Sequence, residues 1–323
     1  MESWIDSYFE SLIKADTETG QSEALALKRA NFPEALYRFR SLERLAYALE
    51  ELRDGYIFVS DPANFNDPYD SALSAQFERL RNRVLEKYGL EYDPNTESKF
   101  FESLDEAAKK DLEVQRGAEQ LAFQGMFGGL LSVLYGPRAY SGGQDFSSSF
   151  RNLVRVGCFT TNPNSVVMWS HYANQHKGIC IEFPGSSMLS NAEFFKLLHP
   201  VRYTERLFDL VQVISPLISE IEPDEVFSPG TPEFNADCYP ILAACHKSSE
   251  WKYEDEWRLV FLDPAGRIEP EFSLEARDIK PSRIILGAKI NKADEAAIKE
   301  LAEKISVQTV NADLAKDRFK IEF

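Results

Sequence analysis

Short apolar segments, separated by helical segments of unequal length, constrain the fold of this chain most. Segments such as Leu36–Arg40, Tyr56–Val59 and Ile179–Phe183 alternate apolar and polar side chains or are rich in β-branched and aromatic residues, which is typical of half-buried strands. A doubly wound parallel sheet needs continuous runs of valine and isoleucine, and this chain has few. We therefore predict an α+β fold, with a mixed or antiparallel central sheet, flanking helices and a helical insertion.

The same patterns predict the remaining elements. Further strands are expected at residues 156–160, 257–261, 283–286 and 318–323. Helices are expected over residues 1–35, from Ser41 to about residue 52, from Asn164 or Ser165 to Gln175, and over residues 205–220, 236–248 and 292–304. Gly178 is the expected C-terminal cap of the helix that ends near Gln175. Residues 61–70 are dense in Asn, Asp and Pro and predict a loop.

Residues 71–150 are mostly helical in pattern and carry none of the motifs described below. We therefore divide the chain into an N-terminal helical segment at residues 1–35 and one α+β domain at residues 36–323, with a helical insertion at about residues 71–150. Residues 36–70 and 150–290 are expected to share one fold that encloses the functional site. The insertion is expected to pack outside that site.

The charge balance excludes some classes of partner. The chain has 52 Asp and Glu against 36 Lys and Arg, a formal net charge of −16, so broad binding to nucleic-acid backbones or anionic membranes is disfavoured, although a local basic pocket is compatible with it. No apolar run approaches the roughly 18 residues of a membrane span, and the acidic start Met1–Asp6 does not resemble a signal peptide. We expect a cytoplasmic protein with free thiols and no membrane partner.

The first candidate cluster is Tyr37–Arg40. In a strand, Arg38 and Arg40 project to one face, while Tyr37 and Phe39 project to the other. Two adjacent guanidinium groups could bind a phosphate or pyrophosphate. The alternative is an exposed strand face whose arginines pair with some of the surplus carboxylates.

The second cluster is Phe65–Asp70. The functional interpretation makes Asn66, Asp67 and Asp70 hydrogen-bond partners that line a site. The structural interpretation is a simple turn, because Asn and Asp before Pro are strong turn formers. A magnesium ion on Asp67 and Asp70 would need further ligands, and we predict no metal site.

The third cluster is Met168–Tyr172, on the predicted helix. Trp169 and Tyr172 share a stripe with Met168, and such a stripe is usually part of a core. His171 lies at the edge of the stripe, where it could face a cleft.

The fourth cluster is Trp251–Arg258. Glu254 and Glu256 are two residues apart at the entrance to a strand, so both could project to one face. Paired carboxylates suit acid–base chemistry or the stabilisation of an oxocarbenium ion. The alternative is that Arg258 simply neutralises them.

These clusters, taken in order, resemble a widespread bacterial family that is classed as a domain of unknown function. Its motifs are Tyr-Arg, Phe-Asn-Asp-Pro-aromatic-Asp, Met-Trp-x-His-Tyr-Ala, Lys-Gly-x-Cys-Ile-Glu-Phe and Trp-x-Tyr-Glu-x-Glu-Trp-Arg. The chain matches them at Tyr37–Arg40, Phe65–Asp70, Met168–Ala173, Lys177–Phe183 and Trp251–Arg258. The resemblance spans roughly residues 36–290 and implies no established activity.

The layout is also similar, more weakly, to that of NAD-dependent ADP-ribosyltransferases. That resemblance implies that Arg38 or Arg40 holds the pyrophosphate of NAD and that Trp169 or Tyr172 stacks on the nicotinamide. It also implies that Glu256 acts on the ribose, with Glu254 assisting. The Ser-Thr-Ser element of many arginine-specific members is missing, and only Phe159-Thr160-Thr161 approximates it.

Three functions therefore compete. The first is an ADP-ribosyltransferase-like enzyme of toxin or phage-defence type that uses NAD as substrate and modifies a protein or nucleic acid. The second is a non-catalytic sensor that binds a nucleotide or another small anion through the same arginines. The third is a metal-dependent nuclease or hydrolase, with Asp67, Asp70 and His171 as ligands.

Overall fold

The structure of the chain is a computed structural model. The described residues are 3–13, 18–74, 102, 104–110, 146–209, 238–263 and 271–323. Most of the predicted insertion at residues 71–150, and most of the predicted helix at residues 205–220, lie outside them. Within these ranges, no helix has the length and apolar character needed to cross a membrane.

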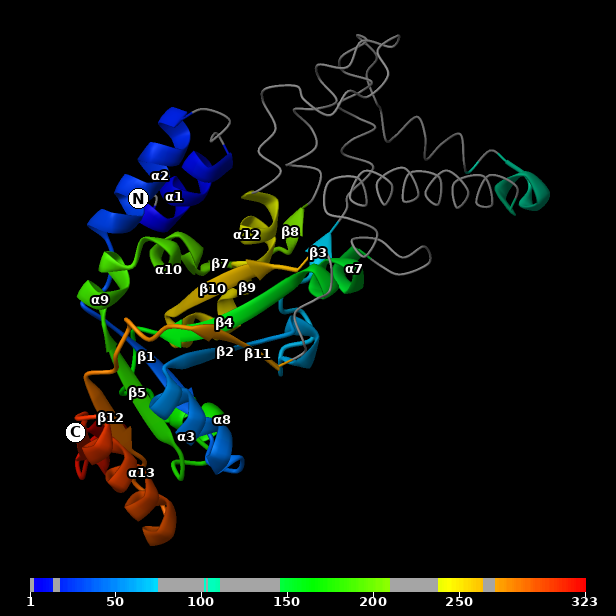
Figure 1. Cartoon of the computed structure of the whole chain (residues 1–323). Coiled ribbons are helices and arrows are strands. Elements are labelled where there is room, and N and C mark those ends of the chain that lie inside the picture. Colours follow the sequence, from blue (N-terminus) through cyan, green and yellow to red (C-terminus); the bar gives the residue numbers. More distant parts are fainter. Residues whose placement is uncertain are drawn as a thin grey trace.

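One mixed sheet organises the described residues (Figure 1). Its main path runs in the order β11-β2-β4-β1-β5-β12-β13, and β10 joins it to β6 by pairing with β4 and β6. The strands are β1 (Ala35–Arg40), β2 (Tyr56–Ser60), β4 (Val154–Thr160), β5 (Ile179–Pro184), β6 (Leu198–Pro200), β10 (Glu256–Leu262), β11 (Glu271–Glu275), β12 (Arg283–Leu286) and β13 (Gln308–Asn311). All pairs in this sheet are antiparallel except β12–β13. The predicted α+β class is confirmed.

The sheet splits between β1 and β4. These strands share one register pair, Tyr37 opposite Thr160. Beyond that pair β1 continues along β5 as far as Arg40, whereas β4 continues along β10. The two halves, β1-β5-β12-β13 and β11-β2-β4-β10-β6, therefore diverge from one point (Figure 1).

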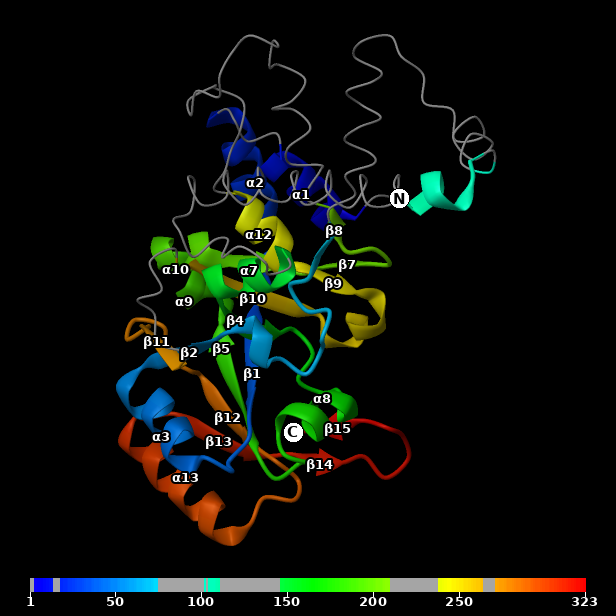
Figure 2. The ribbon, with the colours of Figure 1, turned by 90° about the vertical axis from the view of Figure 1, so that its right-hand side faces the viewer.

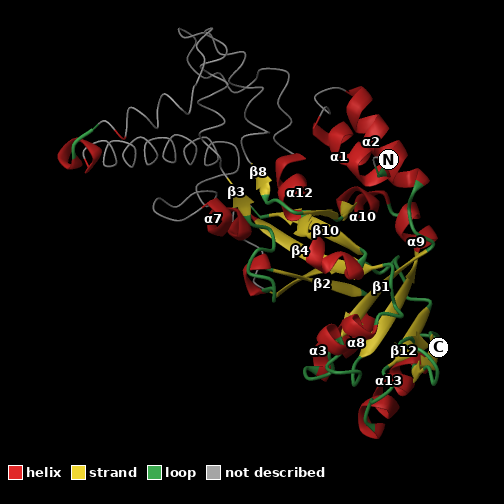
Figure 3. Ribbon diagram, turned by 180° about the vertical axis from the view of Figure 1, so that it is seen from behind, coloured by secondary structure: helices red, strands yellow, loops and turns green. Residues whose placement is uncertain are grey.

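Helices cover both faces of the β5–β12 half (Figure 2). Ile284 and Leu286 pack with α3 (Leu45–Asp54) and α13 (Lys292–Lys304), whereas Ile285, between them, packs with Trp169 of α8 (Val166–Tyr172). This alternation is the two-residue period of a strand buried on both faces. α9 (Gly185–Ser190) lies against β1 and β5. Around the β4–β10 half lie α1 (Trp4–Ile13), α2 (Glu18–Ala30), α7 (Phe146–Leu153), α10 (Ala192–Leu197) and α12 (Cys238–Ala244) (Figure 3).

Side-chain caps and backbone angles fix where the helices begin and end. The predicted helix at residues 292–304 is found as α13. Ser165 caps α8 by accepting a hydrogen bond from the Met168 amide at 3.2 Å, but the helix ends at Tyr172, because residues 174–176 have positive φ angles of 44°, 55° and 70°. Gly178 is therefore not the cap. It is needed because a Cβ there would lie 2.1 Å from the carbonyl oxygen of Arg40.

Other expectations were wrong. The helix predicted from Ser41 begins at Leu45, because the Ser41 hydroxyl accepts from the Glu43 amide within a turn. Part of the helix predicted at residues 205–220 is β8 (Phe208–Asp209), which pairs with β3 (Leu73–Ser74). The helix predicted at residues 236–248 ends at Ala244, because residues 246–248 form β9 and pair with β7 (Arg202–Thr204). The closing strand is reduced to β15 (Ile321–Glu322), paired with β14 (Asp313–Leu314).

The N-terminal helices are part of the core. Tyr8 and Phe9 of α1 are fully buried, and the Tyr8 hydroxyl lies 2.6 Å from Nδ1 of His199. The buried ammonium of Lys28, on α2, donates to the carbonyl oxygens of Phe195 at 2.7 Å and Leu198 at 2.9 Å. These contacts attach α1 and α2 to β6 and therefore to β10.

We predict that Lys28→Met changes the pH dependence of stability. Burial lowers the pKa of Lys28 to about 7 in the folded chain, below its usual value of 10.5. Between these two values the unfolded chain binds the extra proton, so the wild type should gain stability over the variant as pH rises, by up to about 1.4 kcal/mol per pH unit. Urea unfolding of both chains from about pH 7 to pH 9.5 measures this difference. The exposed Lys304→Met is the control, and a pH-independent difference would contradict the prediction.

Candidate functional site

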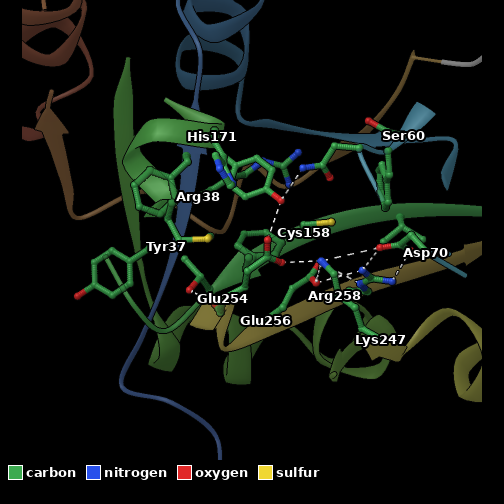
Figure 4. A pocket seen from close by; sticks show the side chains of 18 of the residues that line it. Tyr37, Arg38, Ser60, Asp70, Cys158, His171, Lys247, Glu254, Glu256 and Arg258 are labelled. Atoms are coloured by element: carbon green, nitrogen blue, oxygen red, sulfur yellow. Dashed lines mark hydrogen bonds and ion pairs between the residues drawn. The ribbon is translucent and has the colours of Figure 1, made fainter. Parts of the chain in front are cut away.

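A cavity of about 400 Å³ lies where the sheet splits (Figure 4). Its walls come from β1, β4 and β10, from the loop at residues 61–70, and from α8 and β9. Most of the predicted site residues line it, namely Arg38, Arg40, Asn66, Asp70, His171, Tyr172, Glu254, Glu256 and Arg258. The structure thus brings together side chains from four separate segments of the chain.

Two predicted site residues lie outside the cavity wall, and their predicted contact with a ligand is corrected. Trp169 is fully buried, donates from Nε1 to the carbonyl oxygen of Pro163 at 2.8 Å, and packs edge-on against Phe39. Asp67 is buried in the loop, where one carboxylate oxygen accepts from the Tyr69 amide at 2.9 Å. Both side chains therefore support the cavity wall without lining it. Trp169 fills the core between α8 and β1, and Asp67 stabilises the turn at residues 67–69.

Arg38 and Arg40 project to the same face of β1, as strand alternation predicts. Both pair with Glu51 of α3: Arg38 Nε lies 3.1 Å from Glu51 Oε1, and Arg40 Nη2 donates to the same oxygen at 2.8 Å. Burial alone would raise the pKa of Glu51, but Arg40 and Arg38 outweigh burial and lower it. Two guanidinium groups thus share one carboxylate, which leaves a net charge of +1 at this end of the cavity.

Arg38 is the deeper of the two arginines. Its side chain is 4% exposed, and Nη2 donates a hydrogen bond to the carbonyl oxygen of Phe58. Nη1 has no hydrogen-bond partner among the described residues. Burial, and then Arg40, lowers its pKa to about 10, so the group remains charged at neutral pH. Gly157 lies beside this side chain: a Cβ added there would be in ordinary contact with Arg38 Nη1 at 3.4 Å and in tight contact with Val59 at 3.1 Å. A buried donor without a partner is rare and suits an anionic ligand.

Glu254 and Glu256 reach the cavity by a route that differs from the prediction. Glu254 ends the 3-10 helix η2 (Ser249–Glu254), and Glu256 begins β10. Asp255, between them, is left-handed with a φ of 42°. The two carboxylates therefore do not project from one strand, but the reversal at Asp255 still directs both of them onto the same ammonium, that of Lys247.

Lys247 and Arg258 hold three buried carboxylates together (Figure 4). Lys247 Nζ lies 2.5 Å from Glu254 Oε2, 2.9 Å from Glu256 Oε2 and 3.8 Å from Asp70 Oδ2. Arg258 binds Asp70 through two bonds of 2.9 and 2.6 Å, and its Nε donates to Glu256 Oε1 at 2.9 Å. With every group charged, this network has a net charge of −1.

The two glutamates differ in electrostatic environment. Burial raises the pKa of Glu256, but Arg258 and Lys247 outweigh burial and hold it at about 2. Burial, and then the charge of Glu256, raises the pKa of Glu254 above its usual value, although Lys247 opposes both. Glu254 is therefore the carboxylate of this pair that takes up a proton first as the pH falls.

Tyr172 links Glu254 to the loop. Its hydroxyl donates to Glu254 Oε1 at 2.6 Å and accepts from Asn66 Nδ2 at 3.3 Å. Burial and the neighbouring Glu254 raise the pKa of Tyr172, so the phenol remains a proton donor. Asn66 and His171 are exposed at the rim.

The proposed metal ligands are not assembled as a group. Asp70 is engaged by Arg258, and Asp67 lies outside the cavity wall. Among the residues that the structure describes, no three His, Cys, Asp or Glu side chains are grouped to hold a metal ion.

Sequence reasoning missed Lys247, Glu51 and Cys158. Lys247 falls within the helix predicted at residues 236–248 but lies on β9, and Glu51 is one of several charged residues on α3. Burial and then Glu256 raise the pKa of the Cys158 thiol, which lines the cavity opposite Arg258 on β10. Two lysines, Lys247 and Lys252, precede the Glu-x-Glu pair in the sequence, and the pattern alone does not tell which of them binds the carboxylates.

We predict that Asp70→Asn destabilises the fold by about 3 kcal/mol, because Arg258 is fully buried and loses its bidentate partner. Urea denaturation with a two-state fit measures the change. Glu300→Gln is the matched control, since it removes a carboxylate from an exposed ion pair and should leave the midpoint unchanged. Equal midpoints for all three chains would contradict the prediction.

Comparisons with known proteins support one expectation from the sequence. Residues 168–259 match the model of a family described as "Protein of unknown function (DUF2971)". The matched region includes three of the five motifs, from Met168–Ala173 to Trp251–Arg258. A search of curated proteins and a search of solved structures gave no match. Over residues 168–259, the chain is thus similar to this family of unknown function, which supports the resemblance expected from the motifs.

Proposed function

We propose that the chain is an NAD-dependent glycosyl-transfer enzyme that resembles ADP-ribosyltransferases and has NAD as its substrate. The observation that supports this best is the convergence of three chemistries in one cavity. A buried guanidinium comes from β1 at Arg38, an aromatic side chain comes from α8 at Tyr172, and two carboxylates come from the end of η2 at Glu254 and the start of β10 at Glu256. Each group suits a different part of a dinucleotide.

The Arg38 end suits the pyrophosphate. Arg38 and Arg40 retain a net charge of +1 after pairing with Glu51, and the buried Arg38 Nη1 has no hydrogen-bond partner within the described part of the chain. Guanidinium groups bind phosphate oxygens with strong charge-assisted hydrogen bonds. The opposite end, at Glu254, has a net negative charge and suits the sugar that becomes cationic.

The proposed reaction breaks the bond between the ribose C1′ atom and the nicotinamide nitrogen. The electron pair of that bond leaves with nicotinamide, which becomes neutral, and positive charge develops on the ribose. A carboxylate beside the ribose stabilises this charge more in the transition state than in the ground state. An acceptor oxygen or nitrogen, from water, a protein or a nucleic acid, then bonds to C1′ and loses its proton.

Within this proposal Glu254 is the acting carboxylate and Glu256 supports it, which reverses the roles implied by the resemblance. Both oxygens of Glu256 are bound by Arg258, and Lys247 binds one of them as well. Its charge is therefore largely compensated. Lys247 binds Glu254 Oε2, whereas among the described residues Glu254 Oε1 accepts only from the neutral Tyr172 hydroxyl. A toxin or phage-defence role in the cytoplasm would fit such chemistry.

We predict that Glu254→Gln lowers the rate of nicotinamide release by roughly 10²-fold or more, about 2.7 kcal/mol, with little change in NAD affinity. Gln keeps the shape of the side chain but removes the charge. Chromatography of nicotinamide and calorimetric titration with NAD measure the two effects.

Glu256→Gln is the comparison variant. It should lower the urea midpoint as well as the rate, because Arg258 and Lys247 lose a shared partner. Wild-type turnover by a folded Glu254→Gln chain would refute the assignment of Glu254.

We predict that Arg38→Gln weakens NAD binding at least tenfold while changing kcat less than KM, because a phosphate clamp acts on the ground state and the transition state alike. Titration with ADP-ribose, which lacks the nicotinamide, should show the same loss. Arg53→Gln, an exposed position, is the control. Equal affinities of wild type and Arg38→Gln for both ligands would remove the arginine from the site.

One observation favours a second candidate, a nucleotide or small-anion sensor. Arg38 Nη1 has no hydrogen-bond partner among the residues that the structure describes, and such a buried donor suits an anion whether or not a reaction follows. Under this alternative the wild type binds NAD or ADP-ribose but releases no nicotinamide. The assay described for Glu254→Gln separates the two candidates.

A further inference from the structure

We propose that Lys247 is a positioning residue, whose ammonium keeps Glu254 ionised and directed at the ligand. The role deepens the proposed function, and it rests on that function only where enzymatic turnover is used as the readout. Lys247 does not need to contact the ligand, since it acts through the carboxylate that it holds.

The position of Lys247 is fixed on several sides. Its strand β9 pairs in parallel with β7, with Lys247 opposite Tyr203. The ammonium lies 5.1 Å from the ring centre of Trp251, and the side chain is 5% exposed. The hydroxyl of Tyr203 accepts from the amide of Glu256 at 2.9 Å, which attaches β7 to the same site. A buried ammonium with this little freedom can hold a carboxylate in one direction.

Charged and titratable groups surround Glu254 on every side. Lys247 comes from β9, Glu256 from β10, Tyr172 from α8 and Tyr253 from η2. Arg258 and Asp70 form the next layer. Among these groups, Lys247 is the cation that binds Glu254 directly.

Removal of Lys247 therefore affects the three carboxylates unequally. Asp70 and Glu256 would keep Arg258, with its bonds of 2.6 to 3.0 Å. Glu254 would keep only the neutral phenol of Tyr172. The network would change from a net charge of −1 to −2, and Glu254 is the site where a proton would relieve this charge.

A pH profile of nicotinamide release tests the inference, with wild type, Lys247→Met and Lys247→Arg. The acidic limb of kcat should move to higher pH by at least one unit in Lys247→Met, because a larger fraction of Glu254 is protonated at each pH. Lys247→Arg retains the positive charge and should keep the limb close to that of wild type. A limb that stays in place in a folded Lys247→Met chain would overturn the proposal.

A second readout does not need turnover. The carboxyl carbon of Glu254, in chains labelled with ¹³C-glutamate and assigned with Glu254→Gln, should titrate at higher pH in Lys247→Met than in wild type. An unchanged titration overturns the role of Lys247. A wild type that releases no nicotinamide but shows the shifted titration refutes the proposed function and leaves the role of Lys247 standing.

A measurement on the wild type covers the case in which Lys247→Met does not fold. The Lys247 ¹⁵Nζ and the Glu254 ¹³Cδ should show a scalar coupling across their hydrogen bond, which is absent in the Lys247→Arg chain. Lack of this coupling in the wild type overturns the proposal.

Discussion

The buried ion-pair network of Lys247 and Arg258 is the interaction on which the rest of the site depends. Three carboxylates and two cations leave water together, so each one requires its partners in place. The network joins the loop at residues 61–70, through Asp70, to β9 and to the start of β10. The loop is far in sequence from β9 and β10, so the pairing of Asp70 with Arg258 fixes how closely the loop approaches them.

The split in the sheet has the complementary role. A continuous ladder between β1 and β4 would leave no space for a ligand, whereas the single pair at Tyr37 and Thr160 opens a wedge. Arg38 occupies the deep end of that wedge beside Gly157. The cavity consequently has a positive end at β1 and a negative end at β10, a polarity that suits a ligand with phosphate at one end and a developing cation at the other.

Strand patterns in the sequence made many of the strands, and the face of β1 that carries the two arginines, predictable. They placed Arg38 and Arg40 on one face, and they identified β1, β2, β5, β10 and β12. They could not reveal Glu51 as the partner of these arginines or Lys247 as the centre of the acid cluster, because each pairing joins two different elements, and alternation describes only the faces of a single strand. The left-handed turn at Asp255 was also hidden, since nothing in Glu-Asp-Glu distinguishes a strand entrance from a reversal. Glu254 and Glu256 look equivalent in the sequence, and their pKa values differ only because their partners in the fold differ.

The alternation of β10 also explains why the N-terminal helices matter to a site that they do not line. Glu256 and Arg258 project into the ion-pair network, while Trp257, between them, projects to the opposite face. There its ring packs against the rings of Trp4 and Phe32, with distances between ring centres of 6.0 and 5.2 Å. Any shift of the N-terminal segment that moves Trp257 must therefore also move the residues on either side of it. The apolar core on one face of β10 therefore helps to fix the position of the charged site on the other face.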